Sequence, residues 1–332
     1  MTRNMEREEQ FYANKNFAFS YSSLNKLLFS PSLFYKDYIL QDREIRTDKH
    51  LVEGKLVHCL VFEPENLNEK FNVVPGKAPS DSVRKILKNM SLYTDAVKLA
   101  DVDDKVILDS LIEFNLYQSL KADEARIAKV RTLDNEPYWE FLSNSSVDVI
   151  NQDTLLDCTA KAEVIKSNEE VMSLFKNQST DFDLDPISTH AEQYLKSDLD
   201  TFAFGLHGYV DYYTIDTETK TVTICDLKTS GKTVDNFSES VDFYNYWLQA
   251  AIYSKMVYDS LGDDRDDYTI TFKFIVIDKY NQVYVYDVSE KSMVNWAEGL
   301  GGVLKIADYH YSERNYSLPY DLLIEKVKLF NK

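Results

Sequence analysis

Two aspartates and a lysine are the residues of this chain whose types and spacing are best suited to chemistry. Asp211 ends the sequence Gly-Tyr-Val-Asp, and Asp226 and Lys228 follow in the apolar run Ile-Cys-Asp-Leu-Lys-Thr-Ser-Gly. Side chains two apart on a strand point to the same face, so Asp226 and Lys228 share a face. An antiparallel neighbouring strand brings Asp211 beside them. We therefore expect two carboxylates and one amine to converge on a single point.

This convergence predicts a metal site. Two buried carboxylates repel each other unless a cation neutralises them, and a hard divalent ion such as Mg²⁺ prefers carboxylate and carbonyl oxygens plus water. Such an ion polarises a phosphodiester oxygen and lowers the pKa of a bound water, while the adjacent lysine orients that water or stabilises developing negative charge. The expected chemistry is phosphodiester hydrolysis. The alternative is that Asp211 and Lys228 form an ordinary structural ion pair at strand ends.

Three further motifs accompany these residues. Gly54 and His58 lie four residues apart and are followed by Phe-Glu-Pro-Glu at 62–65, while residues 20–35 hold a serine-rich run and then Pro31, Phe34 and Tyr35. Downstream, Gln249 and Tyr253 are again four residues apart. With GYVD and ICDLKTSG, this ordered set resembles the D…(D/E)xK signature and flanking motifs of the PD-(D/E)xK nuclease superfamily, in its RecB-like, exonuclease VIII-like (RecE-type) branch. The resemblance covers residues 20–253.

The resemblance implies a role for each matching residue. Lys228 would act on the attacking water, and Gln249 would position the lysine or the substrate. Glu192 is a candidate auxiliary acid, and Tyr253 belongs to the same motif as Gln249. The implied metal ligands are Asp211, Asp226, the Leu227 carbonyl and His58. The two aspartates are also implied to be catalytic residues.

Four of these residues have structural alternatives that the sequence leaves open. A histidine on an apolar helix, such as His58, is often a packed core residue. Gln249 and Tyr253 lie on one helical face and could equally form a polar stripe on a buried helix. Glu192 could equally be a solvated glutamate on a strand.

The implied activity is that of a Mg²⁺- or Mn²⁺-dependent DNA exonuclease, which hydrolyses phosphodiester bonds at free duplex ends for recombination or repair. The resemblance also implies a ring-like homo-oligomer threaded by DNA and a single-strand annealing protein as partner, in the cytoplasm of a bacterial or phage-infected cell. An endonuclease of the same fold is an alternative, because fold and metal site do not determine whether ends are required. A non-catalytic DNA-end binding protein is another.

The charge of the chain needs to be reconciled with a DNA substrate. The formal net charge is −18, whereas phosphate contacts are normally made by lysine and arginine on a basic face. The excess acid lies almost entirely in residues 131–332. Part of it would be the metal site itself, and the rest can lie on a solvated face while a small basic groove contacts DNA. The aromatic residues, 23 Tyr, 18 Phe and 3 Trp, could stack on unpaired bases or simply fill the core.

The order of predicted elements favours an α/β fold with a restriction-endonuclease-like core, a mixed central β-sheet flanked by helices. Residues 1–16 are polar and predict a flexible segment, and 17–332 predict a single nuclease domain with a helical insertion at about 80–180. Ser22 or Ser23 is expected to cap a short helix, and Pro31 to open the next. A helix is predicted over 51–63, antiparallel strands over about 188–229, one helical run over 234–261, a strand hairpin after it, and closing helices.

The cysteines and the apolar runs limit the cellular context. Cys59, Cys158 and Cys225 have no CxxC or CxH spacing, so neither a zinc knuckle nor an iron–sulfur cluster is predicted, and a reducing compartment is expected. The charged N-terminus and short apolar runs predict neither an export signal nor a membrane anchor.

Overall fold

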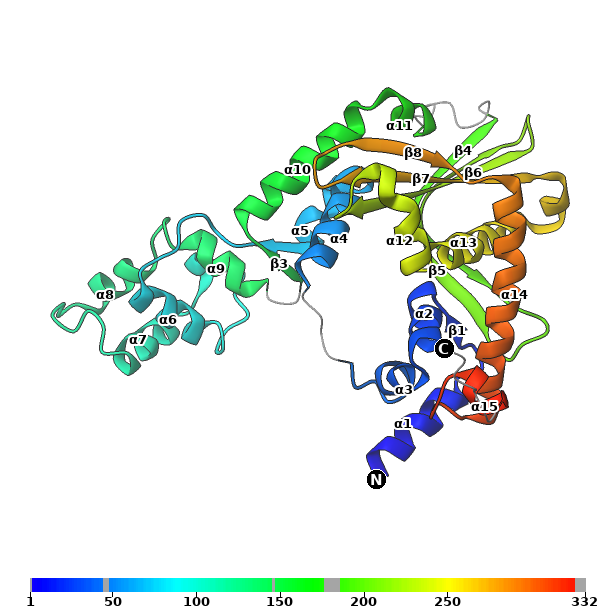
Figure 1. Cartoon of the computed structure of the whole chain (residues 1–332). Coiled ribbons are helices and arrows are strands. Elements are labelled where there is room, and N and C mark those ends of the chain that lie inside the picture. Colours follow the sequence, from blue (N-terminus) through cyan, green and yellow to red (C-terminus); the bar gives the residue numbers. More distant parts are fainter. Residues whose placement is uncertain (1, 44–47, 145–146, 176–185, 326–332) are drawn as a thin grey trace, which may run out of the picture. The chain divides into compact units, whose positions relative to one another are not determined.

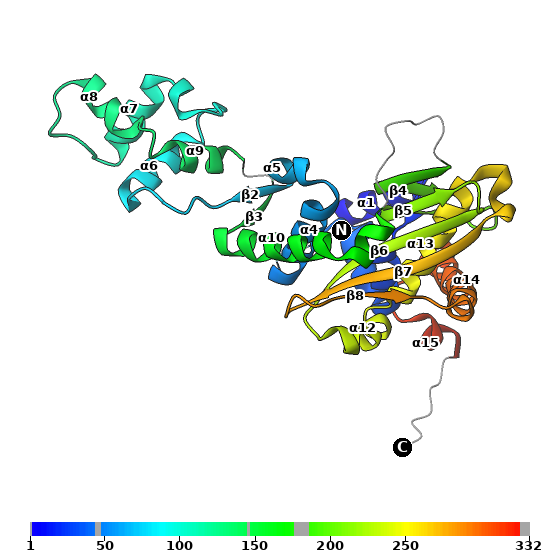
Figure 2. The ribbon, with the colours of Figure 1, turned by 90° about the horizontal axis from the view of Figure 1, so that it is seen from above.

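The chain divides into two compact units. The computed structural model describes residues 2–43, 48–144, 147–175 and 186–325, which Figures 1 and 2 show in two orientations. The sheet unit comprises Met1–Arg46 and Val164–Lys332, and the helical unit comprises Thr47–Glu163. The predicted insertion at about 80–180 lies mostly in the helical unit, and its residues 176–180 are outside the described residues.

The sheet unit is built on a mixed six-stranded sheet, as the sequence predicted. Strands β4, β5 and β6 form an antiparallel meander, and Asp216 closes its second turn by accepting the backbone N–H groups of Glu218 and Thr219. The short strand β1 pairs in parallel with the start of β5. The strands of this sheet are β1 (Ala18–Phe19), β4 (Ile187–Ser197), β5 (Gly205–Asp216), β6 (Thr221–Ser230), β7 (Thr269–Asp278) and β8 (Val283–Asp287).

The second half of the sheet contains the parallel pair that makes the sheet mixed. Strand β7 pairs in parallel with β6 along its whole length, and β8 then pairs antiparallel with β7 as the predicted hairpin. Parallel neighbours require a crossover, which consists here of α12 (Phe237–Phe243) and α13 (Tyr246–Ser260). The α/β class with a mixed sheet and flanking helices is therefore confirmed.

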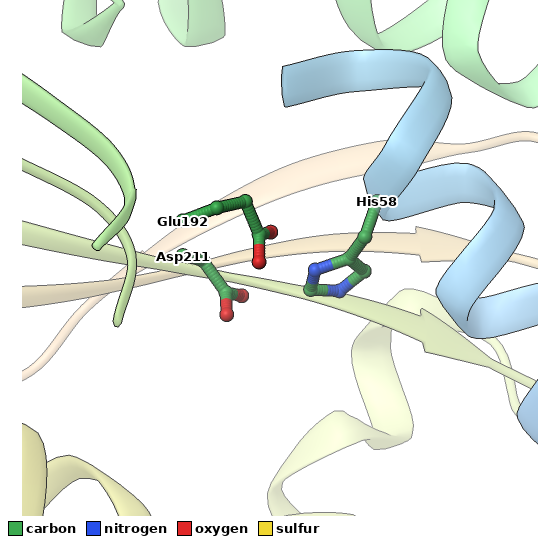
Figure 3. A group of neighbouring side chains, drawn as sticks. All are labelled: His58, Glu192 and Asp211. Atoms are coloured by element: carbon green, nitrogen blue, oxygen red, sulfur yellow. The ribbon is translucent and has the colours of Figure 1, made fainter. Parts of the chain in front are cut away.

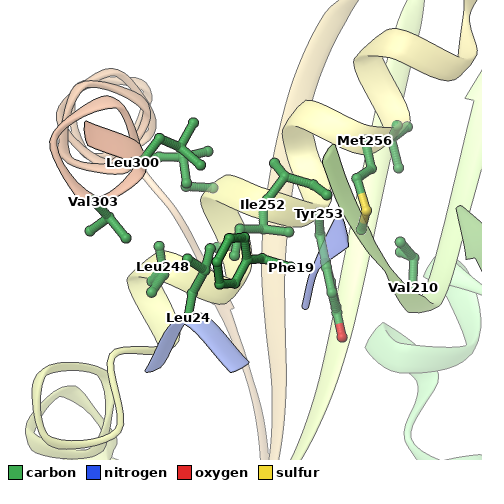
Figure 4. Close-up of a cluster of buried hydrophobic side chains, with 14 of the residues drawn as sticks. Phe19, Leu24, Val210, Leu248, Ile252, Tyr253, Met256, Leu300 and Val303 are labelled. Carbon is green, nitrogen blue, oxygen red and sulfur yellow. The ribbon is translucent and has the colours of Figure 1, made fainter. Parts of the chain in front are cut away.

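Helix α13 is the centre of the core of this unit. Figures 1 and 2 both show α12 and α13 on the same side of the sheet, and α14 (Glu290–Glu313) packs along α13. In Figure 4, Leu248 and Ile252 of α13 lie toward Leu300 of α14, while Met256 lies toward Val210 of β5. The helix is buried on nearly every side, which explains why its residues are apolar almost throughout.

One helical run over 234–261 was predicted, and the structure corrects this. The run is a 3₁₀ turn followed by α12 and α13, and the break lies at Tyr244 and Asn245. Asn245 has φ 57° and ψ 41°, a left-handed conformation that asparagine adopts more readily than most residues. Helical periodicity on both sides of one such residue cannot reveal the break.

The N-terminal segment also differs from the prediction. A flexible segment was expected at 1–16, but Thr2–Ala13 form helix α1, whose Tyr12 hydroxyl hydrogen-bonds to that of Tyr316, 2.8 Å away. Phe11 packs edge-on against Tyr12 and beside Tyr311 of α14. Although the segment is mostly polar, its aromatic residues Phe11 and Tyr12 contact Tyr311 and Tyr316 near the other end of the chain.

The predicted cap of the next helix is wrong by a few residues. Ser20, rather than Ser22 or Ser23, is the N-cap of α2 (Tyr21–Phe29). Ser23 Oγ accepts the Ser20 N–H as the second half of a capping box. Pro31 does open the following helix, α3 (Pro31–Phe34), with Ser30 as its cap. The remaining helical segments of this unit are a π-helical turn (Tyr35–Ile39), α11 (Glu169–Leu174), a 3₁₀ helix (Gly262–Asp267) and α15 (Tyr320–Glu325).

The helical unit has a core of its own. Trp139 is fully buried there, and its indole N–H donates to the Ala96 carbonyl at 3.0 Å. The helix predicted over 51–63 is α4, which ends at Phe62, just before Pro64. The elements of this unit are α4 (Lys49–Phe62), α5 (Leu67–Lys70), α6 (Asp81–Met90), α7 (Asp104–Glu113), α8 (Asp123–Val130), α9 (Glu136–Ser143), most of α10 (Gln152–Ser167) and the parallel strands β2 (Phe71–Val73) and β3 (Asp148–Ile150).

Two sequence-level expectations concern the environment of the chain. All three cysteines are buried thiols. Within the described part of the chain, no helix combines the length and apolar character needed to cross a bilayer.

The central position of α13 leads to a stability prediction. Ile252→Ala removes a fully buried side chain and should lower the free energy of unfolding by about 2–5 kcal/mol, because the cavity left behind collapses only partly. Thermal denaturation should show a midpoint several degrees lower. Val294→Ala on α14, where the side chain is 53% exposed, is the control and should stay within about 0.5 kcal/mol of wild type. Equal midpoints for the two variants would contradict this account of the core.

Candidate metal centre

Asp211 lies where backbone pairing between β5 and β6 stops. The paired residues of these strands end at Tyr212 and Cys225, and the next hydrogen bond is made by a side chain. The Leu227 N–H donates to Asp211 Oδ2 at 2.8 Å, and Asp211 is only 6% exposed. The carboxylate thus takes the place of a backbone carbonyl in the ladder, which fixes its position between the two strands.

The same hydrogen bond fixes the direction of the Leu227 peptide groups. In a strand, the N–H and C=O of one residue point toward the same neighbouring strand. Because the Leu227 N–H points to the β5 side, its carbonyl does too, toward the place where Asp211 interrupts the ladder. A carbonyl oxygen directed at this interruption is compatible with the predicted use of Leu227 as an oxygen ligand.

Asp226 and Lys228 form a buried ion pair on β6. Asp226 is fully buried, the Lys228 side chain is 11% exposed, and Lys228 Nζ contacts Asp226 Oδ2. The ammonium also lies 5.0 Å from the centre of the Tyr246 ring, at the start of α13. The predicted placement of Asp226 and Lys228 on one face of a strand is therefore what the structure shows.

Burial and charge act in opposite directions on this lysine. Desolvation by burial disfavours the ammonium, but Asp226 and then Asp211 favour it, and the pKa of Lys228 is raised above its ordinary value. The charged form of Lys228 is therefore favoured by its carboxylate neighbours. A buried pair of this kind is weak evidence for stability, since the desolvation of both groups offsets much of their attraction.

Glu192 brings a third carboxylate to the same place. The register of β4 and β5 on both sides of Glu192 places it directly opposite Asp211, and like charges directly opposite each other destabilise a sheet. Glu192 also has φ 45°, in the middle of a strand and with a side chain that rarely adopts this conformation. Such strain costs on the order of 1–3 kcal/mol and tends to be found at functional sites.

Figure 3 draws the acids together with the histidine that the sequence singled out. All three residues of this figure, His58, Glu192 and Asp211, are of a type that ligates metal ions, and the two carboxylates offer oxygens within 4.8 Å of each other. Both carboxylates belong to the sheet unit, whereas His58 is carried by α4 of the helical unit, where its ring lies edge-on to Phe62. Asp226 is not a member of this group.

The donor chemistry within the sheet unit fits a divalent cation. After burial, the charges of Asp211, Asp226 and Glu192 raise the pKa of Tyr253. Lys228 contacts Asp226 in this cluster of carboxylates. A set made mainly of carboxylate oxygens is the donor chemistry that Mg²⁺, Mn²⁺ and Ca²⁺ prefer.

Gln249 and Tyr253 form a buried pair on the α13 face toward these acids. Gln249 Nε2 donates to the Tyr253 hydroxyl at 2.9 Å, and both residues are more than nine-tenths buried. Burial, followed by the charges of Asp211 and Asp226, raises the pKa of Tyr253 well above its ordinary value. Tyr253 is thus a neutral hydroxyl held beside negative charge, which is more than the polar stripe that their spacing alone allowed.

Gly208, the first residue of the GYVD motif, allows this helix to approach. A Cβ at position 208 would lie 3.3 Å from Met256 Cε and 3.4 Å from Tyr253 Cε1. The first distance is tighter than most contacts, so the Met256 side chain would have to move by a few tenths of an ångström to admit a Cβ at Gly208. The absence of a side chain therefore permits close packing beside the acids.

Sequence reasoning missed two tyrosines at this site. The Tyr246 ring lies 5.0 Å from Lys228 Nζ. Burial raises the pKa of Tyr246, the charge of Lys228 opposes this shift, and the charge of Asp226 adds to it. Burial, Tyr246 and Asp226 likewise raise the pKa of Tyr21, the first residue of α2. Tyr21 follows Ser20 in the serine-rich motif, which was the one signal that could have pointed to it.

Comparison with solved structures shows a similarity in structure. No protein-family model and no curated protein matches the chain. The chain is similar to a crystal structure of a "Putative exonuclease" from Eubacterium rectale, with a TM-score of 0.47 and 11% sequence identity. The similarity covers 97% of this chain and 92% of that one.

The opposed carboxylates lead to a prediction about stability and metal binding. Glu192→Gln removes a like charge opposite Asp211, so without metal it should raise the free energy of unfolding by roughly 0.2–1 kcal/mol. The same change should weaken Mn²⁺ binding, measured by calorimetry, and reduce the rise in thermal midpoint that Mn²⁺ produces.

Asp287→Asn is the matched control, because Asp287 is a carboxylate of the same sheet that pairs with Lys273 on its exposed surface. It should leave Mn²⁺ affinity unchanged. Unaltered Mn²⁺ binding by Glu192→Gln would remove Glu192 from the site.

Proposed function

We propose that this protein is a metal-dependent deoxyribonuclease of the PD-(D/E)xK type that hydrolyses phosphodiester bonds at the ends of duplex DNA. The observation that carries the proposal is the arrangement of Asp211 and Asp226 around the end of the β5–β6 ladder, with Lys228 paired to Asp226. A structural ion pair alone does not require a second buried carboxylate beside the first.

The proposed ion is Mg²⁺ or Mn²⁺. When bound, it would polarise the phosphodiester and lower the pKa of a water molecule. Asp211 and Asp226 would hold it with the Leu227 carbonyl, and Glu192 and His58 would complete the set. The strained backbone at Glu192 supports a functional rather than a solvated role for this side chain.

The remaining polar residues would place charge and hydrogen bonds around the phosphate. Asp226 and Asp211 raise the pKa of Lys228, so it would stabilise negative charge and orient water rather than accept a proton. Tyr246 and Asp226 limit the directions in which the ammonium can move. Gln249 and Tyr253 would act as positioning residues, since they support the acids from the α13 side.

The net charge of −18 affects how such an enzyme meets DNA. A divalent ion would offset the negative charge of the carboxylates at the site, which would otherwise repel the phosphate backbone. Binding should therefore depend on the ion and fall steeply as salt is raised. The proposal also includes a homo-oligomer that encircles DNA, because several copies would hold a strand that one acidic chain holds weakly.

The role of Lys228 can be tested with a matched lysine nearby. In the folded protein, Lys228→Ala should lower the rate of DNA hydrolysis about 10²–10³-fold, because a buried electrostatic group at the phosphate is lost. Lys232→Ala is the control, since Lys232 lies four residues later, pairs with Glu239 at the surface and should keep its activity. The measurement is a time course on end-labelled linear DNA with Mg²⁺ or Mn²⁺, and EDTA should stop the reaction.

Closed circular DNA in the same experiment separates the related functions. An exonuclease should degrade linear DNA and leave closed circles intact, whereas cutting of circles would identify an endonuclease. DNA binding without hydrolysis under every divalent ion would identify a non-catalytic end-binding protein. Hydrolysis by Lys228→Ala at the wild-type rate would refute the proposed site.

The proposed nitrogen ligand predicts a change in metal preference. Imidazole favours Mn²⁺ over Mg²⁺ more than carboxylate does, so His58→Ala should weaken Mn²⁺ binding by about tenfold or more and affect Mg²⁺ less. His50→Ala is the control, because His50 is an exposed histidine on the same helix, α4. The measurement is a direct titration of both variants with each ion. Equal affinities for wild type and His58→Ala would show that His58 is a packed core residue and not a metal ligand.

A further inference from the structure

An exposed pair of aromatic rings lies at the connection between α12 and α13. Phe243 is 77% exposed and Tyr244 is 48% exposed. Single exposed apolar residues are ordinary on protein surfaces, but a continuous apolar surface marks a binding site. These two rings are the exposed end of a series that continues into the candidate metal centre.

The ring series runs from the surface to Lys228. Phe243 lies edge-on to Tyr244 with ring centres 4.9 Å apart, and Tyr244 stacks on Tyr246 at 5.4 Å with the ring planes 28° apart. Tyr246 in turn lies 5.0 Å below Lys228 Nζ and stacks on Phe237 inside the core. An aromatic surface therefore begins beside the lysine that would contact the scissile phosphate and ends in solvent.

The loop that presents these rings is held by the Tyr244 carbonyl and by the Asn245 side chain. The Tyr21 hydroxyl and the Asn25 side-chain amide both donate to the Tyr244 carbonyl. Asn245, in its left-handed conformation, donates to Asn25 Oδ1 at 2.8 Å and accepts from the Trp247 indole at 3.1 Å. None of these bonds involves the rings of Phe243 or Tyr244, so a fixed loop keeps two apolar rings in water, which is preorganisation for a ligand.

From this arrangement we infer that Phe243 and Tyr244 form a stacking platform for the unpaired bases of a DNA strand whose phosphate occupies the site at Asp226 and Lys228. Bases inside a duplex are already stacked and cannot lie on protein rings, whereas unpaired bases stack on aromatic side chains whatever their sequence. The inference rests on the proposed nuclease function and deepens it. The substrate that it names is a duplex end with single-stranded or frayed nucleotides.

The absence of charge on the platform is consistent with this ligand. Phosphate contacts would need lysine or arginine, whereas the platform offers ring faces next to Asp242, which disfavours a backbone phosphate at that point. The strand would thus be held by its phosphate at Lys228 and by its bases at the rings. Ring stacking also depends little on salt, which suits a protein with net charge −18.

The test measures binding to two DNA probes by the full chain, with Ca²⁺ in place of Mg²⁺ and at low salt. One probe is a blunt duplex, and the other is the same duplex with a three-nucleotide extension that contains 2-aminopurine, whose fluorescence reports stacking. Phe243→Ala and Tyr244→Ala should each weaken binding to the extended probe about 5- to 150-fold and restore its fluorescence. Binding to the blunt duplex should change less than twofold.

Matched variants separate stacking from general apolar contact and from misfolding. Phe243→Trp should bind as wild type does, and Phe243→Leu should behave as Phe243→Ala, because leucine keeps the apolar character but not the ring. Tyr284→Ala removes another 52% exposed aromatic ring of the same sheet unit, on β8, and should have no effect. Thermal midpoints should be unchanged for the Phe243 variants, since that side chain makes little contact with the core.

Three outcomes would overturn the inference: equal loss of affinity for both probes, full binding by Phe243→Leu, or a change in native mass in Phe243→Ala, which would make the ring a contact between protein chains. Failure of the nuclease proposal gives a different pattern. If the wild-type protein stacks the extension but hydrolyses no DNA with Mg²⁺ or Mn²⁺, the stacking platform would be supported and the nuclease proposal would be refuted.

Discussion

Where β5 and β6 stop pairing, the Asp211 carboxylate accepts the N–H of Leu227, and the rest of the candidate site depends on this hydrogen bond. It holds an acid inside the sheet at the place where the backbone ladder opens, and it turns the Leu227 carbonyl toward the same opening. The parallel pairing of β6 with β7 continues through this region, so Asp226 and Lys228 are held on a strand that is rigid on its other edge. A flexible loop could not keep these groups so close to one another.

The cluster is arranged for charge rather than for stability. Glu192 opposite Asp211, Asp226 fully buried and a strained backbone at Glu192 are each unfavourable for an isolated fold. The apolar packing of α13 against the sheet and α14 offsets these terms, since it removes a large apolar surface from water. The apolar core therefore keeps the carboxylates close together, and a bound cation would reduce the repulsion between them.

Local patterns in the sequence were sufficient for much of this structure. Alternating apolar residues predicted the β4–β5–β6 meander and the β7–β8 hairpin, and the spacing of Asp226 and Lys228 predicted their common face. Long-range contacts were not predictable in this way. The hydroxyl pair of Tyr12 and Tyr316 joins residues 304 apart in sequence, and it is part of what turns a polar N-terminus into helix α1. The left-handed residues Glu192 and Asn245 have no periodic signal either, yet one distorts the strand opposite Asp211 and the other creates the loop that carries Phe243 and Tyr244.

Gly208 is the residue of the GYVD motif that contributes by having no side chain. A Cβ at this position would lie 3.3 Å from Met256 Cε and 3.4 Å from Tyr253 Cε1, both on α13. The α13 helix also carries Tyr246 and Gln249, so its distance from β5 determines how closely the tyrosine under Lys228 and the polar pair approach the acids. Packing beside the candidate site therefore leaves little room for even one added methyl group at this position. A residue without a side chain thus contributes to the geometry of the candidate site through packing alone.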